Sequence, residues 1–305
     1  HHARKNLLRR KAYELKSMQN LKMWVGSVVD KVMKVEIIPA IVAKKELYFD
    51  ELADYAVKLA EEQFRFSKNG FYKDPSIKKT DAGNAFCILD IHEIKTPFKE
   101  QDLVDCYETI RKAIRNIPEI RMPDGNLLIN YLKEANSLTP NVTNWVIEIE
   151  KAKLAPQIDL LGQFNWKPVI MDWKLSSSYV SDYSRQLMIA GIVVYLKRLE
   201  NTDKKPYTYT DIKLYEVNLL KGIVKEHEFT EEKVHDLINY INLTSSDIHL
   251  LTERKDVGID DFELTDDEAH CRNCNFQTLC SHLLINNNQY DEKSYIESIQ
   301  DQQLA

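Results

Sequence analysis

The stretch that decides the fold is QIDLLG (residues 157–162), which is followed closely by PVIMDWK (residues 168–174). The second stretch opens with an apolar run, which is typical of a strand buried on both faces. Asp159 lies in the strand that residues 157–162 predict. Asp172 and Lys174 follow the apolar run, where exposed charges are otherwise unusual. We therefore predict neighbouring strands that bring two carboxylates and a lysine together.

The acid-x-lysine spacing at residues 172–174 suits a particular chemistry. Side chains alternate along a strand, so Asp172 and Lys174 share one face. Hydrolysis of a phosphodiester needs an activated water and neutralisation of developing negative charge, and divalent ions held by carboxylate oxygens supply both. The lysine can orient the water or stabilise the charged phosphate. The pattern predicts a Mg²⁺ or Mn²⁺ site at Asp159 and Asp172; the alternative is a solvated strand edge, where Asp-x-Lys is also common.

Further elements are expected around this core. Residues 145–150 alternate apolar and charged side chains, which predicts a first strand, and residues 213–220 predict a further one. Helical patterns cover residues 4–45, 46–66, 99–116, 124–136, 181–199 and most of the chain from 221 to about 252. The order of strands and helices predicts an α/β core with long helical additions.

The sequence suggests a linear division of the chain into five segments. They are an N-terminal helical segment (1–45), a mainly helical insertion (46–140), a nuclease core (141–225), C-terminal helices with a cysteine cluster (226–290) and a tail (291–305) of low expected structure.

The motifs resemble the RecB-type branch of the PD-(D/E)XK nucleases, which includes the AddB nuclease domain and the CRISPR-associated exonucleases. That branch has an aspartate on one strand, then Asp-Trp-Lys, then a helix with a Tyr/Gln motif. Here these are Asp159, DWK (residues 172–174) and YSRQL (residues 183–187). The chain departs from the pattern at Leu175-Ser176, where Thr-Gly is common, and at Ala190, where a second tyrosine is frequent.

The resemblance implies a restriction-endonuclease-like fold, with a mixed central sheet flanked by helices and a C-terminal metal staple. It implies that Asp159 and Asp172 bind the metal together with the backbone carbonyl of Trp173. Lys174 would serve the water, and Gln186 would contact the DNA or the lysine.

The branch also carries Gly-x-x-x-His on an early helix, with the histidine as a metal ligand. The matching stretch, WVGSVVD (residues 24–30), has Asp30 in the histidine position. Carboxylates are good ligands for Mg²⁺ and Mn²⁺, so Asp30 is a candidate third ligand. The alternatives are a weakened site and a simple polar position on an amphipathic helix.

Three cysteines are packed into ten residues near the C-terminus, at Cys271, Cys274 and Cys280. This spacing is a poor disulfide framework and indicates a metal centre, for which zinc is physically suitable. It is similar to the iron–sulfur staple of the same nuclease branch, which implies a [4Fe-4S] cluster joining the N- and C-terminal ends. The upstream cysteine of that pattern is missing, and His2 stands nearby as a candidate fourth ligand. Cys87 and Cys106 are further alternatives.

The charge pattern gives mixed indications about DNA. There are 41 basic and 47 acidic side chains, a net charge of −6, which counts mildly against a nucleic-acid partner. The chain nevertheless opens with a basic stretch, in which Arg4, Arg9 and Arg10 are candidate DNA contacts. Tyr179 and Tyr183 flank the predicted site and suit stacking on unpaired bases.

We expect a cytoplasmic, metal-dependent DNA nuclease that acts on single strands or DNA ends in recombination, repair or defence. The sequence lacks an uninterrupted apolar run of about 18 residues, so we expect no membrane span. It also lacks a Walker A loop, so a helicase would be a separate partner chain. The chief alternative is a catalytically weakened nuclease-fold subunit that binds DNA or a protein and is stabilised by an iron–sulfur or zinc site. A zinc-stabilised interaction module without nucleic acid is a third alternative.

Overall fold

A computed structural model describes residues 6–74, 76–150, 152–176, 183–253, 265–272, 274–287 and 289–301. The chain divides into two compact units. Unit 1 comprises residues 1–25, 57–107 and 255–305, and unit 2 comprises residues 26–56 and 108–254.

Helices make up most of the described chain. In chain order the α-helices are α1 (Leu7–Ser17), α2 (Leu21–Val32), α3 (Ile38–Val42), α4 (Phe49–Lys68), α5 (Lys79–Ala82), α6 (Asp90–Glu93), α7 (Glu100–Asn116), α8 (Leu128–Lys133), α9 (Ser184–Leu199), α10 (Glu231–Thr252), α11 (Glu268–Arg272), α12 (Gln277–Ile285) and α13 (Glu292–Asp301). A π-helical turn, η1 (Met33–Ile37), joins α2 to α3, and short 3₁₀ turns are η2 (Phe71–Lys73), η3 (Gly83–Ala85), η4 (Ile117–Glu119) and η5 (Tyr209–Asp211).

Unit 2 is built on a mixed sheet of five strands in the order β1-β4-β5-β6-β7. These strands are β1 (Ser137–Val142), β4 (Ile158–Phe164), β5 (Lys167–Lys174), β6 (Lys213–Asn218) and β7 (Ile223–His227). Strands β5 and β6 are parallel and α9 connects them, whereas the other neighbours are antiparallel. Strands β2 (Ile147–Ile149) and β3 (Ala152–Leu154) form a separate hairpin.

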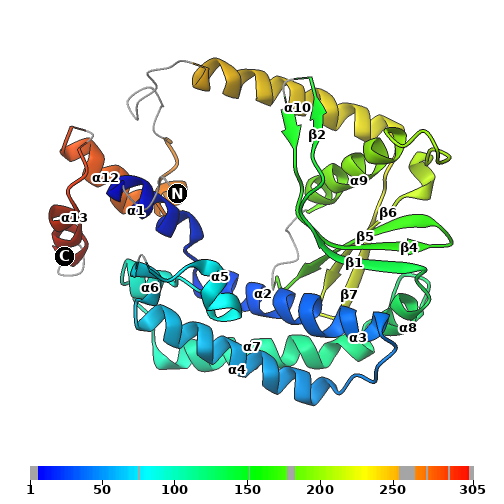
Figure 1. The fold of residues 1–305 in the computed structure, drawn as a ribbon, viewed down its shortest axis with the longest axis horizontal. Helices are drawn as coiled ribbons and strands as arrows, with labels where there is room; N and C mark the ends of the chain where they lie inside the picture. Colours follow the sequence, from blue (N-terminus) through cyan, green and yellow to red (C-terminus); the bar gives the residue numbers. More distant parts are fainter. Residues whose placement is uncertain are drawn as a thin grey trace. The chain divides into compact units, whose positions relative to one another are not determined.

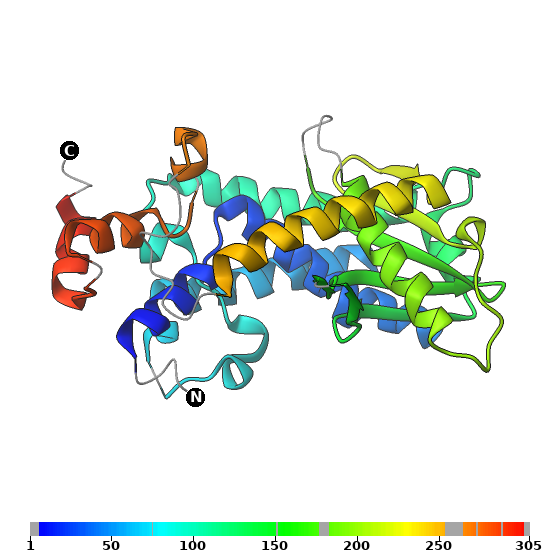
Figure 2. The same ribbon diagram turned by 90° about the horizontal axis from the view of Figure 1, so that it is seen from above.

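Helix α9 packs on one face of this sheet, with α10 beyond it (Figures 1 and 2). The face is apolar at its centre because Leu161, Ile170 and Leu214, from three adjacent strands, are buried against α9 residues such as Ile192. The same alternation that buries Ile170 places Asp172 and Lys174 on this face. Asp172 and Lys174 therefore lie on the covered side of the sheet, near the start of α9.

Unit 1 joins the first and last described segments of the chain. Leu15 and Met18 at the end of α1 pack against Leu279 of α12 and Tyr295 of α13. The side-chain amide of Asn275 adds two hydrogen bonds, to the carbonyl oxygens of Leu15 (3.1 Å) and Met18 (2.9 Å).

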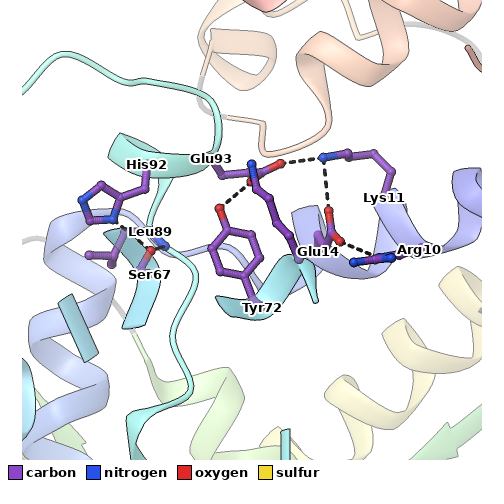
Figure 3. Close-up of polar contacts among 9 residues, drawn as sticks. Arg10, Lys11, Glu14, Ser67, Tyr72, Leu89, His92 and Glu93 are labelled. Carbon is purple, nitrogen blue, oxygen red and sulfur yellow. Dashed lines mark hydrogen bonds and ion pairs between the residues drawn. The ribbon is translucent and has the colours of Figure 1, made fainter. Parts of the chain in front are cut away.

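A buried ionic network lies beside this core (Figure 3). The Glu93 side chain is only 1% exposed, and its carboxylate is 2.6 Å from Lys11 Nζ and 3.0 Å from Lys73 Nζ. The Tyr72 hydroxyl also donates to it, and Glu14 forms a second ion pair with Lys11. Burial opposes the ionisation of Glu93, but the two ammonium groups and the hydrogen bonds lower its pKa to about 2.

The structure confirms an α/β fold with a mixed central sheet and flanking helices, and it corrects several local predictions. Strands β1 and β7 lie where helices or no element were expected, so the predicted core limits at 141 and 225 fall inside these two strands. The predicted first strand at 145–150 belongs to the separate hairpin, because β2 pairs with β3. The expected unstructured tail is wrong, since α13 is helical and buries Tyr295.

The N-terminal helical prediction was also too simple. Helix α1 ends at Ser17, and Gln19 then forms an isolated β-bridge with Leu89. Helix α2 begins at Leu21. Pro39 has no N–H to donate, and its ring excludes the carbonyl of residue 35, which accounts for the π-turn before α3. In the described ranges, no helix combines the length and apolar character needed to cross a membrane.

Candidate active site

A row of carboxylates crosses three neighbouring strands of unit 2. Asp172 on β5 pairs in register with Glu216 on β6. Asp159 precedes Leu160, which pairs with Met171, so that Asp159 lies beside Asp172 on the other side. The backbone N–H of Trp173 donates to Asp159 Oδ2 at 2.9 Å, which fixes this carboxylate against β5. The sequence prediction that Asp159 and Asp172 converge is confirmed.

These acids are buried beside one another, and their pKa values reflect it. Burial, reinforced by the nearby Asp172 and Asp30 carboxylates, raises the pKa of Asp159 to about 7. Burial also raises the pKa of Asp172, although the Lys174 ammonium opposes the shift. Like charges in a poorly solvated place disfavour full ionisation, so the row is a site that a cation would stabilise.

Lys174 and Gln186 close a polar ring around Asp172. Lys174 Nζ lies 2.5 Å from Asp172 Oδ2 and 3.1 Å from Gln186 Oε1. The Gln186 amide donates from Nε2 to Asp172 Oδ1 at 3.0 Å. Because Gln186 is in the first turn of α9, the predicted Tyr/Gln motif does reach the Asp-x-Lys strand.

Tyr183 lies directly beside Lys174. Lys174 Nζ is 4.1 Å from the centre of the Tyr183 ring, a cation–π contact. Tyr179, the other predicted stacking residue, is outside the described residues.

Asp30 reaches the same neighbourhood from α2, one turn before the π-helical η1. Burial raises its pKa, and the Asp172 charge contributes to this shift, whereas Lys34 opposes it. The electrostatic coupling to Asp172 and Asp159 favours the interpretation of Asp30 as part of the carboxylate group over that of a simple polar helix position.

The sequence analysis missed Glu216 and His227. Glu216 is partly buried next to Asp172, and His227 Nε2 lies 3.1 Å from Glu216 Oε2. His227 is buried at the end of β7. A signal for Glu216 was available, because it is an isolated acid in the predicted strand LYEVN (residues 214–218).

The donor set suits a divalent ion of the kind predicted. Asp30, Asp159 and Asp172 offer hard carboxylate oxygens, which Mg²⁺ and Mn²⁺ prefer. Each of the three has a raised pKa, so the uncompensated charge of the group is itself a feature that ion binding would relieve. Among the described residues, no three His, Cys, Asp or Glu side chains are already arranged around a common point.

The three clustered cysteines belong to unit 1 and lie near one another. Burial and the neighbouring Cys271 and Cys274 thiols raise the pKa of Cys280. The backbone N–H of Phe276 donates to Cys274 Sγ at 3.4 Å, and Asn275 between them is tied to the end of α1. The cysteine segment is therefore attached to the N-terminal helix.

Three residues were candidates for the fourth ligand of this cluster: His2, Cys87 and Cys106. His2 lies outside the described residues. Burial raises the pKa of the Cys87 thiol to about 12, and burial together with two nearby aspartates raises that of Cys106 to about 11.

The candidate DNA contacts of the N-terminal segment are placed in part. Arg9 is exposed on α1, whereas Arg10 is engaged by Glu14, with 3.1 Å between Nε and Oε1. Arg4 falls outside the described residues.

No known protein family matches the chain, and no characterised protein is significantly similar to it. The chemical groups of the candidate site are the carboxylate row, Lys174 and Gln186. Together these residues can hold a cation, position a lysine ammonium group and bind a charged phosphate ester.

Proposed function

We propose that the chain is a metal-dependent nuclease that hydrolyses phosphodiester bonds in DNA. One observation carries the proposal. Lys174 and Gln186 both contact Asp172, which belongs to a buried row of like-charged carboxylates, and they contact each other. A purely structural cluster would be expected to balance its charges, as Glu93 does in unit 1. The mixed sheet with α9 on its face is compatible with a restriction-endonuclease-like fold of the RecB-type PD-(D/E)XK branch.

The metal-binding residues in this proposal are Asp30, Asp159 and Asp172, with the Trp173 carbonyl as an additional oxygen donor. A bound Mg²⁺ or Mn²⁺ ion supplies a water of lowered pKa and neutralises charge on the phosphate. Asp159 is held in place by the Trp173 N–H, so its second oxygen can face the ion.

Lys174 and Gln186 provide the remaining chemistry. The Lys174 ammonium is held by Asp172 and Gln186 and can stabilise the negative charge that develops on the phosphate oxygens. Gln186 keeps Asp172 and Lys174 at a fixed separation, which pre-organises both for a substrate that arrives later. Tyr183, against Lys174, offers a flat surface for an unpaired base, which favours single-stranded DNA or DNA ends.

The decisive experiment is cleavage of a labelled single-stranded oligonucleotide in Mn²⁺. We expect Asp172→Asn and Lys174→Ala each to lower the rate by at least about a hundredfold, the effect of losing one charge-stabilising group in an active site. Asp203→Asn and Lys153→Ala are matched controls at exposed positions of the same unit and should cleave normally. Near-parental cleavage by Asp172→Asn would refute the site. DNA binding by a parent chain that never cleaves would favour the catalytically weakened alternative.

For the cysteine segment we propose a metal staple of unit 1, holding an iron–sulfur cluster or zinc. The N–H···S hydrogen bond to Cys274 and the effect of Cys271 and Cys274 on the pKa of Cys280 support it. Metal analysis and the visible spectrum of anaerobically purified protein distinguish the two. We expect Cys274→Ala to lose the metal and lower the unfolding temperature, while cleavage per folded molecule is retained; an unchanged unfolding temperature would contradict the staple.

A further inference from the structure

A hollow in unit 2 adjoins the carboxylate row. It encloses about 350 Å³ between the start of α9, the end of β7 and the first half of α10. Arg185, which lines it, immediately precedes the Gln186 that holds Asp172. His227, which also lines it, is bonded to Glu216, the register partner of Asp172. Two chain segments that contact the candidate site therefore also form the walls of the hollow.

The walls combine an apolar surface with a flat, cationic one. Met188 and Leu237 contribute buried apolar side chains. The Arg185 guanidinium lies 5.3 Å from the centre of the Tyr240 ring, whose side chain is 54% exposed. Tyrosine rings and guanidinium planes are surfaces on which unpaired bases stack, and thioether and aliphatic groups accept the other face of a base without a desolvation cost.

The polar rim has acceptors for the edge of a base. Asp236 presents a carboxylate there, while the other acid of the rim, Glu228, is 2.6 Å from Lys233 and so is neutralised. A carboxylate accepts hydrogen bonds from an exocyclic amino group, as on cytosine or adenine, whereas thymine has a carbonyl oxygen, an acceptor, where cytosine has its amino group. The rim therefore favours bases that carry an amino group.

We propose that this hollow binds an unpaired, amino-bearing nucleobase of the strand whose phosphate reaches the carboxylate row. The inference rests on the proposed nuclease function and adds a base-binding position to it. The base stacks between Tyr240 with Arg185 on one side and Met188 with Leu237 on the other, and its amino group faces Asp236.

The test is fluorescence anisotropy with fluorescein-labelled octamers of deoxycytidylate and of thymidylate, in EDTA so that no cleavage occurs. We expect the parent protein to bind the cytosine octamer several-fold more tightly. Tyr240→Ala should weaken binding of both octamers by about tenfold, the size of effect that loss of one stacked contact produces. Asp236→Ala should remove the preference for cytosine. Tyr48→Ala is the matched control, because Tyr48 is similarly exposed, at 58%, in the same unit.

The outcomes separate this proposal from the nuclease proposal. Equal binding by Tyr240→Ala and Tyr48→Ala, or no binding by the folded parent, overturns the base pocket whether or not the protein cleaves DNA in Mn²⁺. Binding with the expected preference, in a protein that never cleaves, supports the pocket and overturns the nuclease. A preference that survives Asp236→Ala overturns the assigned role of Asp236.

Discussion

Glu93 in unit 1 and Asp159 in unit 2 are both buried carboxylates, yet their pKa values move in opposite directions. Glu93 has Lys11 and Lys73 against it, and its pKa falls to about 2. Asp159 has Asp172 and Asp30 nearby, and its pKa rises to about 7. Burial opposes ionisation at both positions, so the neighbouring charges decide the sign.

The difference separates a structural cluster from a functional candidate. In the Glu93 network both acids, Glu93 and Glu14, are paired with cations from the same chain. At the strand carboxylates Asp159 and Asp172 the opposing cation is Lys174, and its charge does not offset the effect of burial on either pKa, so a bound cation would stabilise the site. Stability and activity should therefore respond in opposite ways when an acid is neutralised in one cluster or the other.

The largest effect is expected in unit 1. Glu93→Gln leaves the buried Lys11 ammonium with a single carboxylate partner, Glu14, and we expect a loss of about 3 kcal/mol in the free energy of unfolding. Urea denaturation measures it, with the exposed acid Glu61→Gln of the same unit as the control. Cleavage per folded molecule should be unchanged. A stability equal to that of the parent would show that the network is not a structural one.

The reverse result is expected for Asp159→Asn. In EDTA at pH 8 the parent holds neighbouring buried carboxylates in charged form, and the isosteric amide removes one charge while its oxygen still accepts from Trp173. We expect the variant to be more stable by about 1 kcal/mol, since like-charge neighbours are relieved. Adding Mn²⁺ should then stabilise the parent more than the variant. Equal stabilisation of both by Mn²⁺ would mean that the ion binds elsewhere.

The two clusters should also divide the pH range. A lowered folded pKa gives stability that is present above the unfolded pKa and lost as the pH falls, so unit 1 weakens from about pH 4.5 towards pH 2. A raised carboxyl pKa does the opposite, so unit 2 loses stability as the pH rises from about 4 to about 7. Hydrogen exchange in EDTA, read on peptides covering residues 86–94 and 167–174, follows each unit separately. Identical pH trends for the two peptides would contradict the assignment.

The smallest effect concerns Asp30, which reaches the carboxylates from α2 and not from a strand of the sheet. Imidazole favours transition metals, whereas carboxylate serves Mg²⁺ and Mn²⁺ alike. Asp30→His should raise the ratio of Mn²⁺-dependent to Mg²⁺-dependent cleavage by a few-fold, and Asp30→Ala should lower both. If Asp30→Ala cleaves as the parent does with either ion, Asp30 is not a metal ligand and the proposed ligands are Asp159 and Asp172.

Much of unit 2 could be predicted because local pattern and burial agree there. The apolar run before Asp172 and the alternation around Asp159 gave β5, β4 and the convergence of their acids. Strand β1 was missed because Pro140 and the polar SLTPNV pattern (residues 137–142) give little strand signal, and its place is decided by pairing with β4.

The missing parts of the site depend on how the strands pair, which places Glu216 beside Asp172 and His227 beside Glu216. His227 becomes a candidate site residue only when β7 pairs with β6 and brings its side chain to Glu216. No local spacing in the sequence relates these two residues. The charge balance of Glu93 likewise depends on Lys11, which is 82 positions away along the chain.

Asn275, which binds the carbonyl groups at the end of α1, has a consequence for the order of folding. Its two partners precede it by 260 and 257 positions, so these bonds close very large loops. Unit 2 ends at residue 254 and can complete its sheet before residues 265–301 leave the ribosome. The end of α1 can pack on Phe66 and Ile88 early, but its contacts with Leu279 and Tyr295 must wait for that last segment, and contacts of such high sequence separation form slowly. During synthesis this part of the apolar surface of α1 therefore stays open to aggregation and chaperone binding after the strands of the sheet have been made.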